Sequence, residues 1–312
     1  MAQEQNGNSA SRVGIIIAYF LIFVVWGSTY YFIGVALKGL PPFLLGALRF
    51  TTAGLLLLFW CWYKGEPVFR KSLIQKSAIS GIVLLFIDMA VVMLAQKYVS
   101  SSLVAIVASS TAIWIMALDV PMWKTNFRSL RTIAGILIGF VGVLMLYIEQ
   151  FIYDTSTNEH RQYGILILVF GCISWAIGTL YTKYSSSNTE EVNAFTGSAW
   201  QMLFASAMFW IFATITGEVA TTDLEQVSYT SWLSLLYLIV FGSIMAYSAY
   251  IWLLKIRPAT EVGTHAYINP VVAIIIGRYL GMEQVSNLQI FGLIIILLAT
   301  GIIGLKPKKS KY

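Results

Sequence analysis

Runs of about twenty consecutive apolar residues recur along the whole chain, and this feature constrains its fold more than any other. Of the 312 residues, 58% are hydrophobic and 11% are charged, and the mean hydropathy is +0.77. Soluble domains carry about 25% charged residues, so the composition excludes that class. Because a lipid-exposed backbone must satisfy its hydrogen bonds within its own segment, the runs predict α-helices. The sequence therefore predicts an all-α membrane protein.

Ten membrane-spanning helices are predicted from these runs. Their ranges are 13–36, 41–61, 75–95, 99–119, 130–148, 163–184, 193–216, 230–254, 259–280 and 287–305. The loops between them are short, which indicates a compact bundle of antiparallel neighbours. We expect residues 1–12 to be a disordered N-terminus without a cleaved signal peptide, and residues 306–312 to be a basic tail.

Lysine and arginine fall mainly on one side of the predicted bundle. With the N-terminus in the cytoplasm, fifteen of the 20 basic residues lie in cytoplasmic segments, four lie outside, and Arg49 lies within a span. Cytoplasmic loops of membrane proteins carry such an excess of positive charge. The sequence thus predicts that both termini are cytoplasmic. The same distribution accounts for the pI of about 9.2 without a nucleic-acid partner.

The two halves of the chain repeat one layout. The segments Lys97–Asp119 and Lys255–Gly277 begin 158 residues apart, and each joins a span that ends in lysine to a span rich in small and hydroxyl residues. Trp26 and Trp175 lie midway along the first and sixth spans. The repeats are then residues 13–148 and 163–305. Five spans per repeat invert the second copy, and inverted repeats around a central cavity are typical of secondary transporters.

Several short motifs carry a resemblance to a known family. They are Trp26-Gly-Ser-Thr-Tyr30, Leu48-Arg49-Phe50, Ser174-Trp-Ala176, Phe241-Gly-Ser243, and Ala266-Tyr-Ile-Asn-Pro-Val-Val272 followed by Gly277. Together they resemble the EamA-type drug/metabolite transporters, and in particular the YedA/PecM-like group of exporters. The resemblance covers both halves, residues 13–305.

This resemblance implies ten helices in two EamA repeats, with a central cavity built mainly by spans 1, 3, 4, 6, 8 and 9. It also implies a place in the cell inner membrane and export of small metabolites, often amino acids or related compounds. Two residues depart from the family pattern. Ala112 occupies the position that is equivalent to Pro270 in the first repeat, where the family often has a proline. A weaker break of the helix is therefore expected in the first half. Asp88 stands near a position that is commonly neutral and polar.

Arg49 and Asp88 are charged residues deep within predicted spans. At 1.5 Å per residue, they lie about 12 Å and about 13.5 Å from the outer ends of neighbouring spans, so they reach a similar depth. One interpretation is a structural ion pair that neutralises both groups in a low dielectric. A second has Arg49 binding a substrate carboxylate. A third has Asp88 carrying the proton that couples transport. The sequence leaves all three open.

The ninth predicted span carries an imidazole and a proline. His265 either gates or couples transport by titrating near neutral pH, donates to a substrate, or bonds to a neighbouring backbone carbonyl. Pro270 removes one helical hydrogen bond and is predicted to be a hinge, which either exposes a carbonyl near Ala266 to a water-filled cavity or makes only a structural kink. Asn269, beside the proline, is expected to contact the substrate.

Aromatic side chains gather in the same spans. Trp26 and Trp175 lie near the midplane, where an interfacial belt cannot explain them, so they either pack between helices or contact a ligand. An aromatic wall suits flat or apolar substrates, and cationic ones through the ring face. The predicted substrate-binding residues are Trp26, Tyr30, Arg49, Asp88, Trp175, Tyr247, His265, Tyr267 and Asn269.

The function predicted from these features is secondary-active export of small organic metabolites by alternating access. The alternatives are an intramembrane lipid-processing enzyme and a membrane receptor or scaffold. The sequence contains no P-loop, HExxH or GxSG pattern, and its loops are too short for a receptor domain. Two cysteines and two distant histidines lack metal-ligand spacing, so we expect no cofactor or metal. The expected partners are a small molecule, the lipid bilayer and the proton as a candidate coupling ion, with the protein a monomer or weak homodimer.

Overall fold

A computed structural model describes residues 11–99, 101–153, 161–186, 193–280 and 286–304 of the chain. Within these ranges the secondary structure is helical and includes no strand. The predicted all-α class is therefore confirmed. The predictions for residues 306–312 and for most of 1–12 lie outside the described residues.

The first half of the chain forms long helices, two of which contain a π-helical stretch. They are α1 (Arg12–Phe20), η1 (Leu21–Val25) and α2 (Trp26–Ala36) in one rod; α3 (Pro42–Tyr63); α4 (Lys71–Ser80), η2 (Gly81–Ile87) and α5 (Asp88–Ala95) in a second rod; α6 (Ser101–Ala108); α7 (Thr111–Leu118); and α9 (Leu130–Tyr153). Two short helices, η3 (Val120–Met122) and α8 (Trp123–Asn126), connect α7 to α9.

The second half follows the same plan. Its helices are α10 (Arg161–Ser186); α11 (Ala194–Ile215); α13 (Tyr229–Tyr237), η5 (Leu238–Tyr247) and α14 (Ser248–Ile256) in one rod; α15 (Ala259–Val262); α16 (His265–Leu280); and α17 (Asn287–Gly304). The short helices α12 (Glu218–Thr221) and η4 (Leu224–Gln226) connect α11 to α13.

Six helical segments in the described residues are long and apolar enough to cross a membrane. They are Arg12–Ala36, Pro42–Tyr63, Lys71–Ala95, Leu166–Ser185, Ala194–Ile215 and Tyr229–Ile256. The spans predicted at 99–119 and 259–280 fall short of this length because each is divided into two helices. Leu130–Gly142 of α9 and Ile290–Ala299 of α17 are further apolar helical segments.

The two divided spans are interrupted in the same way. The first break is at Ser109–Ser110, between α6 and α7, and the second at Gly263–Thr264, between α15 and α16. At each break, backbone N–H groups bond to the carbonyl three residues back, as in Ile113 to Ser110 (2.9 Å) and Tyr267 to Thr264 (3.0 Å). The first half is therefore broken as well, although it lacks the proline of the family pattern.

Pro270 does not end its helix, so the expected position of the break is corrected. Helix α16 continues through Pro270, and the interruption lies before His265. A proline removes only one helical hydrogen bond, whose acceptor here is the carbonyl of Ala266, and Ala266 lines the central cavity described below. A hinge at Pro270 stays a prediction.

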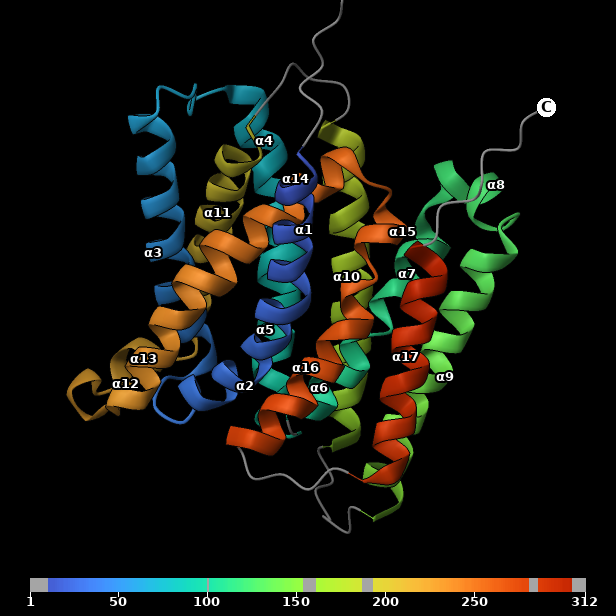
Figure 1. Cartoon of the computed structure of the whole chain (residues 1–312). Helices are drawn as coiled ribbons and strands as arrows, with labels where there is room; N and C mark the ends of the chain where they lie inside the picture. The colour runs from blue at the N-terminus through green and yellow to red at the C-terminus, as the bar shows by residue number, and fades with distance from the viewer. Residues whose placement is uncertain (1–10, 100, 154–160, 187–192, 281–285, 305–312) are drawn as a thin grey trace, which may run out of the picture.

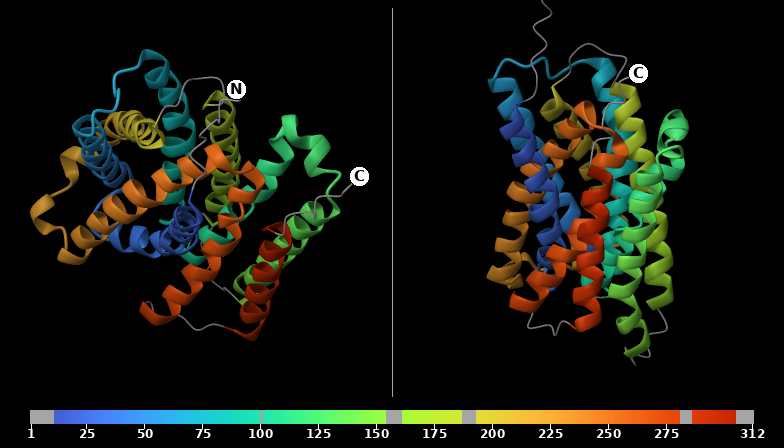
Figure 2. Two further views of the ribbon diagram at one scale, coloured as in Figure 1. Left: turned by 45° about the horizontal axis from the view of Figure 1, so that its top comes forward. Right: turned by 45° about the vertical axis from the view of Figure 1, so that its right-hand side comes forward.

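The described chain begins and finishes at one end of the bundle, at the start of α1 and the end of α17; we call this end the terminal face (Figures 1 and 2). Helix α3 packs along α11, and α9 packs along α17 at the side of the bundle. A Cβ atom at Gly142 of α9 would lie 2.9 Å from the carbonyl oxygen of Gly292, so glycine permits the close approach of α9 and α17. The central helices α2, α5, α10 and α16 lie between these pairs.

Candidate functional site

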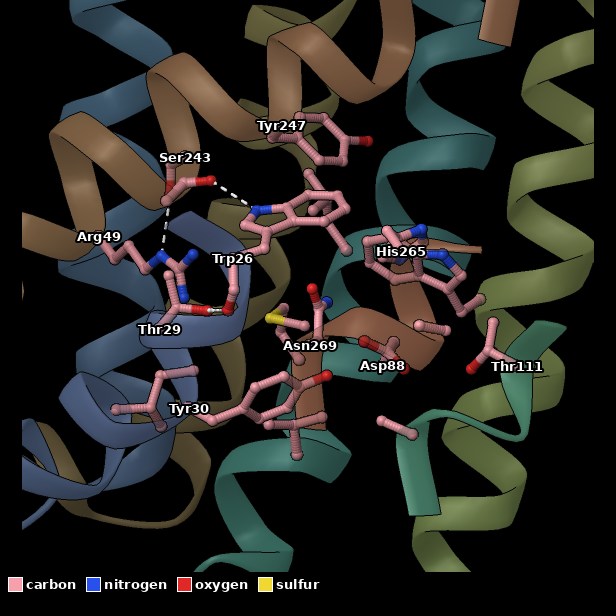
Figure 3. Close-up of a pocket in the computed structure, with 18 of the residues that line it drawn as sticks. Trp26, Thr29, Tyr30, Arg49, Asp88, Thr111, Ser243, Tyr247, His265 and Asn269 are labelled. Carbon is pink, nitrogen blue, oxygen red and sulfur yellow. Dashed lines mark hydrogen bonds between the residues drawn. The ribbon is translucent and has the colours of Figure 1, made fainter. Parts of the chain in front are cut away.

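A cavity lies in the middle of the bundle, where helices from both halves of the chain meet (Figure 3). Its walls come from α2, α3, η2, α5, α6, α7, α10, η5 and α16. The wall from α3 adds the second predicted span to those implied by the family resemblance. All predicted substrate-binding residues except Tyr267 line this cavity: Trp26, Tyr30, Arg49, Asp88, Trp175, Tyr247, His265 and Asn269.

Arg49 enters the cavity from α3 with one edge of its guanidinium group fixed. Its Nε donates to Ser243 Oγ at 2.8 Å, and its Cζ lies 4.9 Å from the centroid of the Phe50 ring. Gly242 leaves room for the group, since a Cβ there would lie 3.1 Å from Nη2. Within the described residues Nη1 has no hydrogen-bond partner, although Arg49 is only 4% exposed. A buried donor without an acceptor is costly, so this nitrogen favours a ligand that can accept.

Asp88 enters the cavity from α5, on the other side of the space (Figure 3). It is 8% exposed, and no described residue forms a hydrogen bond or an ion pair with its carboxylate. A Cβ at Gly171 of α10 would lie 3.3 Å from Oδ1, so the carboxylate is packed against that glycine.

The interpretation of Arg49 and Asp88 as a structural ion pair is wrong. Both residues are described, and no ion pair joins them. Their depths are similar, but depth does not fix the direction in which a side chain leaves its helix. Arg49 points to Ser243 of η5, and Asp88 points to α10. A guanidinium group and a carboxyl group therefore face one cavity from separate walls.

A cluster of five aromatic rings lies at and behind the wall of the cavity. Trp26 and Trp175, which occupy equivalent places in the two halves, meet edge to face with 5.4 Å between ring centroids. Tyr250 and His265 lie 5.1 Å and 5.2 Å from Trp26, and Tyr247 lies 6.3 Å from it. The edge-to-face contact of the two tryptophans is a favourable geometry at this distance. The two tryptophans therefore pack between helices and also offer ring surface to the cavity.

Hydrogen bonds hold the tryptophan rings in place. Trp26 donates through Nε1 to the carbonyl oxygen of Gly242 at 2.9 Å, and Trp175 donates to the Tyr250 hydroxyl at 3.1 Å. The Tyr250 hydroxyl also bonds to Thr179 Oγ1 at 2.6 Å. Tyr250 itself is fully buried behind the cavity wall, so it positions Trp175 and does not line the cavity.

One of the three predicted roles of His265 is seen in the structure, and the other two stay predictions. Its Nδ1 lies 2.9 Å from the carbonyl oxygen of Val262, which is the bond to a neighbouring backbone group considered from the sequence. In the neutral ring this contact places the proton on Nδ1 and leaves Nε2 as an acceptor. The ring also lines the cavity.

Asn269 connects α16 to the π-helical stretch of the first rod. With its amide nitrogen turned towards the surrounding acceptors, it donates to the carbonyl oxygens of Ile22 at 3.0 Å, Phe23 at 3.1 Å and His265 at 3.1 Å. Ile22 and Phe23 belong to η1, where the regular α-helical bonding is interrupted. Asn269 therefore supplies a donor that η1 needs inside the bundle.

The other two π-helical stretches receive donors in the same way. Ser174 of α10 donates to the carbonyl oxygen of Val83 in η2 at 2.6 Å. Trp26 donates to Gly242 in η5. In each of the three stretches η1, η2 and η5, a carbonyl accepts from a side chain that belongs to the other half of the chain. π-helical stretches occur often at functional sites; η2 and η5 contribute residues to the cavity wall, and η1 directly precedes Trp26, which also lines it.

Tyr267 does not reach the cavity, which corrects the prediction that it lines it. It is fully buried, its hydroxyl donates to the carbonyl oxygen of Ile136 at 3.4 Å, and its ring lies 3.2 Å from where a Cβ of Gly139 would be. His265 and Asn269 are four residues apart and share one face of α16, whereas Tyr267 lies between them and points to α9.

The sequence also left one important residue unassigned. Ser243 fixes Arg49, and the signal for it was the Phe241-Gly-Ser243 motif within an apolar span, where a hydroxyl group needs a partner. The cavity offers charges, hydrogen-bonding groups and ring faces for binding. In the part of the chain that the structure describes, no group of three or more His, Cys, Asp or Glu side chains comes together to hold a metal ion.

Comparison with known proteins identifies the family. The model of the EamA-like transporter family matches this chain twice, over residues 13–148 and 162–305. The chain therefore belongs to the EamA-like transporter family, and it contains the EamA unit twice. It is a multi-pass membrane transporter.

Several relatives align over nearly the whole chain. The "Uncharacterized inner membrane transporter YedA" of Escherichia coli K12 is 31% identical over 291 residues, which cover 92% of this chain and 90% of the relative. The "Probable amino-acid metabolite efflux pump" of the same organism is 25% identical over 296 residues, with 93% and 95% covered. A protein of known crystal structure, 17% identical, has a TM-score of 0.74 over 94% of this chain and 97% of its own, so it shares the fold.

Replacing Ser174 by alanine removes the donor to the Val83 carbonyl in η2. We expect the free energy of unfolding to fall by about 1–3 kcal/mol, because a buried acceptor loses its partner. Thermal unfolding of the purified protein in detergent measures this loss.

Ser198→Ala is the matched control. Ser198 is also a buried hydroxyl, but it donates to Ala194 within its own helix at 2.9 Å, so we expect a change below about 0.5 kcal/mol. Equal losses in the two variants would contradict a special need for a donor at η2.

Proposed function

We propose that this protein is a secondary-active transporter that exports small organic metabolites, such as amino acids or related compounds, by alternating access. The cavity carries this proposal: it places charged, hydrogen-bonding and aromatic groups inside a bundle of apolar helices, and both EamA units build it. Polar groups within a membrane mark solute pathways. The relative named a probable amino-acid metabolite efflux pump supports the solute class and the direction. Family membership favours this function over a lipid-processing enzyme, a receptor or a scaffold.

Ten membrane crossings in two inverted repeats belong to this proposal. The packing of the helices supports it. A contact between a helix of the first half and a helix of the second has a counterpart in which the two halves have changed places. Helix α10 packs on η2 and α5, and the rod of η1 and α2 packs in the same way on η5 and α13. Helix α10 also packs on α6 and α7, as α2 packs on α16. The pairs α3–α11 and α9–α17 map onto themselves. Two inverted repeats produce such a twofold relation.

We place the terminal face in the cytoplasm of a cell bounded by an inner membrane. The ends of α3, α4, α10 and α14 at this face carry Lys64, Lys71, Lys183 and Lys255, in agreement with the positive-inside rule. The inner membrane is the location that the name of the YedA relative gives for that protein.

Contacts beyond the ring cluster support a state closed at the terminal face. Tyr19 of α1 donates to Glu261 Oε1 at 2.8 Å, and the same oxygen lies 3.8 Å from Arg257 Nε. Lys183 of α10 donates to the carbonyl oxygens of Leu254 at 3.0 Å and Arg257 at 2.7 Å. These contacts tie α1, α10, α14 and α15 together. In an alternating-access cycle they separate when the cavity turns towards the cytoplasm.

A proton is the coupling ion in this proposal, and Asp88 is its carrier. Its carboxylate lies in the cavity, and no described residue neutralises it. A carboxylate in that position can take up a proton when the cavity faces one side and release it when the cavity faces the other.

High-level expression is expected to raise the resistance of a bacterial host to toxic analogues of the exported metabolites, and Trp175→Ala to abolish that resistance. Trp175 forms part of the cavity wall, so its loss removes ring contacts with the solute. Ile177→Ala is the matched control, because Ile177 is on the same helix and 48% exposed at the surface of the bundle. A broad panel without any resistant wild-type phenotype would contradict export. Full resistance in cells that express Trp175→Ala would contradict binding of the solute in this cavity.

In proteoliposomes, an imposed pH gradient is expected to accelerate flux of a solute identified in this way. Asp88→Asn should remove the dependence on the gradient, because an amide cannot carry the proton. Glu225→Gln, which changes an exposed carboxylate in η4 outside the cavity, should leave it intact. An Asp88→Asn protein with unchanged rate and pH dependence would exclude this carrier.

A further inference from the structure

We infer that the cavity selects dipolar solutes, which present an anionic group to Arg49 and a cationic group to Asp88. This inference rests on the proposed export function and specifies the solute that the same site takes. It assigns each of the two charged walls a separate partner on one molecule.

The Arg49 wall is prepared for an anion. Ser243 holds Nε and Phe50 supports the face of the guanidinium group, so its orientation is fixed before a ligand arrives. The nitrogen that has no partner, Nη1, belongs to a side chain that is 4% exposed and lines the cavity. A carboxylate or a similar oxyanion is the acceptor that matches a guanidinium edge in charge and geometry.

The Asp88 wall is prepared for a cation. Its carboxylate is 8% exposed, receives no hydrogen bond from a described residue and faces the same space. The oxygen acceptors of a carboxylate match the N–H donors of an ammonium group. Thr111 and Tyr30, which also line this part of the cavity, add hydroxyl groups beside it.

Arg49 and Asp88 do not neutralise one another, so each needs a partner of its own. Arg49 and Asp88 form no ion pair, and Trp26 and Asn269 lie between them in the view of Figure 3. An anion alone would leave the Asp88 carboxylate unpaired in a low dielectric, and a cation alone would leave Arg49 unpaired. A dipolar solute satisfies both groups, and its apolar body can lie against the rings of Trp26 and Trp175.

Matched sets of small molecules test the inference on the purified full-length protein. Each set contains a free amino acid, its amide, which keeps only the cation, and its N-acetyl derivative, which keeps only the anion. Sets built on alanine, leucine, phenylalanine and tryptophan vary the size of the apolar body. The measurement is the rise in thermal unfolding temperature at graded concentrations, from which a Kd follows.

For the wild type, we expect a free amino acid of at least one set to bind about tenfold or more tightly than its amide and its N-acetyl derivative. Arg49→Gln should weaken binding of the free amino acid until its Kd equals that of the amide. The Kd of the amide itself should not change. Asp88→Asn should weaken binding of the free amino acid until its Kd equals that of the N-acetyl derivative. The Kd of the N-acetyl derivative should not change. Glu225→Gln should bind all three as the wild type does. A general folding defect cannot produce this crossed pattern, because each variant retains one unaltered ligand.

Three results would overturn the inference. They are equal binding of the one-charge derivatives and the free amino acid by the wild type, a uniform loss for all three ligands in both variants, and no stabilisation by any of the four free amino acids. The resistance panel separates this failure from failure of the export function. If expression of the wild type gave resistance to toxic solutes with a single charge, the export function would stand and the selection of dipolar solutes would be contradicted.

Discussion

Backbone carbonyl groups inside an apolar bundle impose the constraint on which the rest of this structure depends. A carbonyl without a donor is costly where no water reaches it, and the π-helical stretches η1, η2 and η5 create this need near the middle of three rods. Asn269, Ser174 and Trp26 supply donors to these stretches, each from the opposite half of the chain. The same bonds therefore join the two EamA units and place irregular backbone beside the cavity. Trp26 does both at once, since its Nε1 holds η5 while its ring meets Trp175.

This framework also determines how charge is presented. Ser243 of η5 accepts a hydrogen bond from Nε of Arg49, which holds the guanidinium group at the wall formed by α3 and η5. The group therefore forms no ion pair with Asp88. If the two groups neutralised one another, the cavity would offer a solute only neutral polar groups and rings. Because they remain apart, each group stays available to a ligand or an ion. The contacts at the terminal face join α1 to α15 and α10 to α14.

The sequence predicted the fold where elementary solvation determines it. Apolar runs had to be helices, and polar groups within them had to face a shared space, which is why most of the predicted residues line the cavity. The errors came from rotation about a helix axis and from backbone irregularity. Tyr267 shares its span with His265 but points to another helix, and Arg49 matches Asp88 in depth but not in direction. Nothing in the apolar residues Leu21–Val25 indicates a π-helical stretch, and the side chain that bonds to its carbonyl groups, Asn269, lies far along the chain.

An experimental structure of the full-length protein with an exported solute bound tests the central claim most directly. We expect density for the solute inside the cavity between Arg49 and Asp88, against the rings of Trp26 and Trp175, with an anionic group at Nη1 of Arg49. Solute density outside this cavity, or an ion pair between Arg49 and Asp88 in the presence of solute, would contradict it.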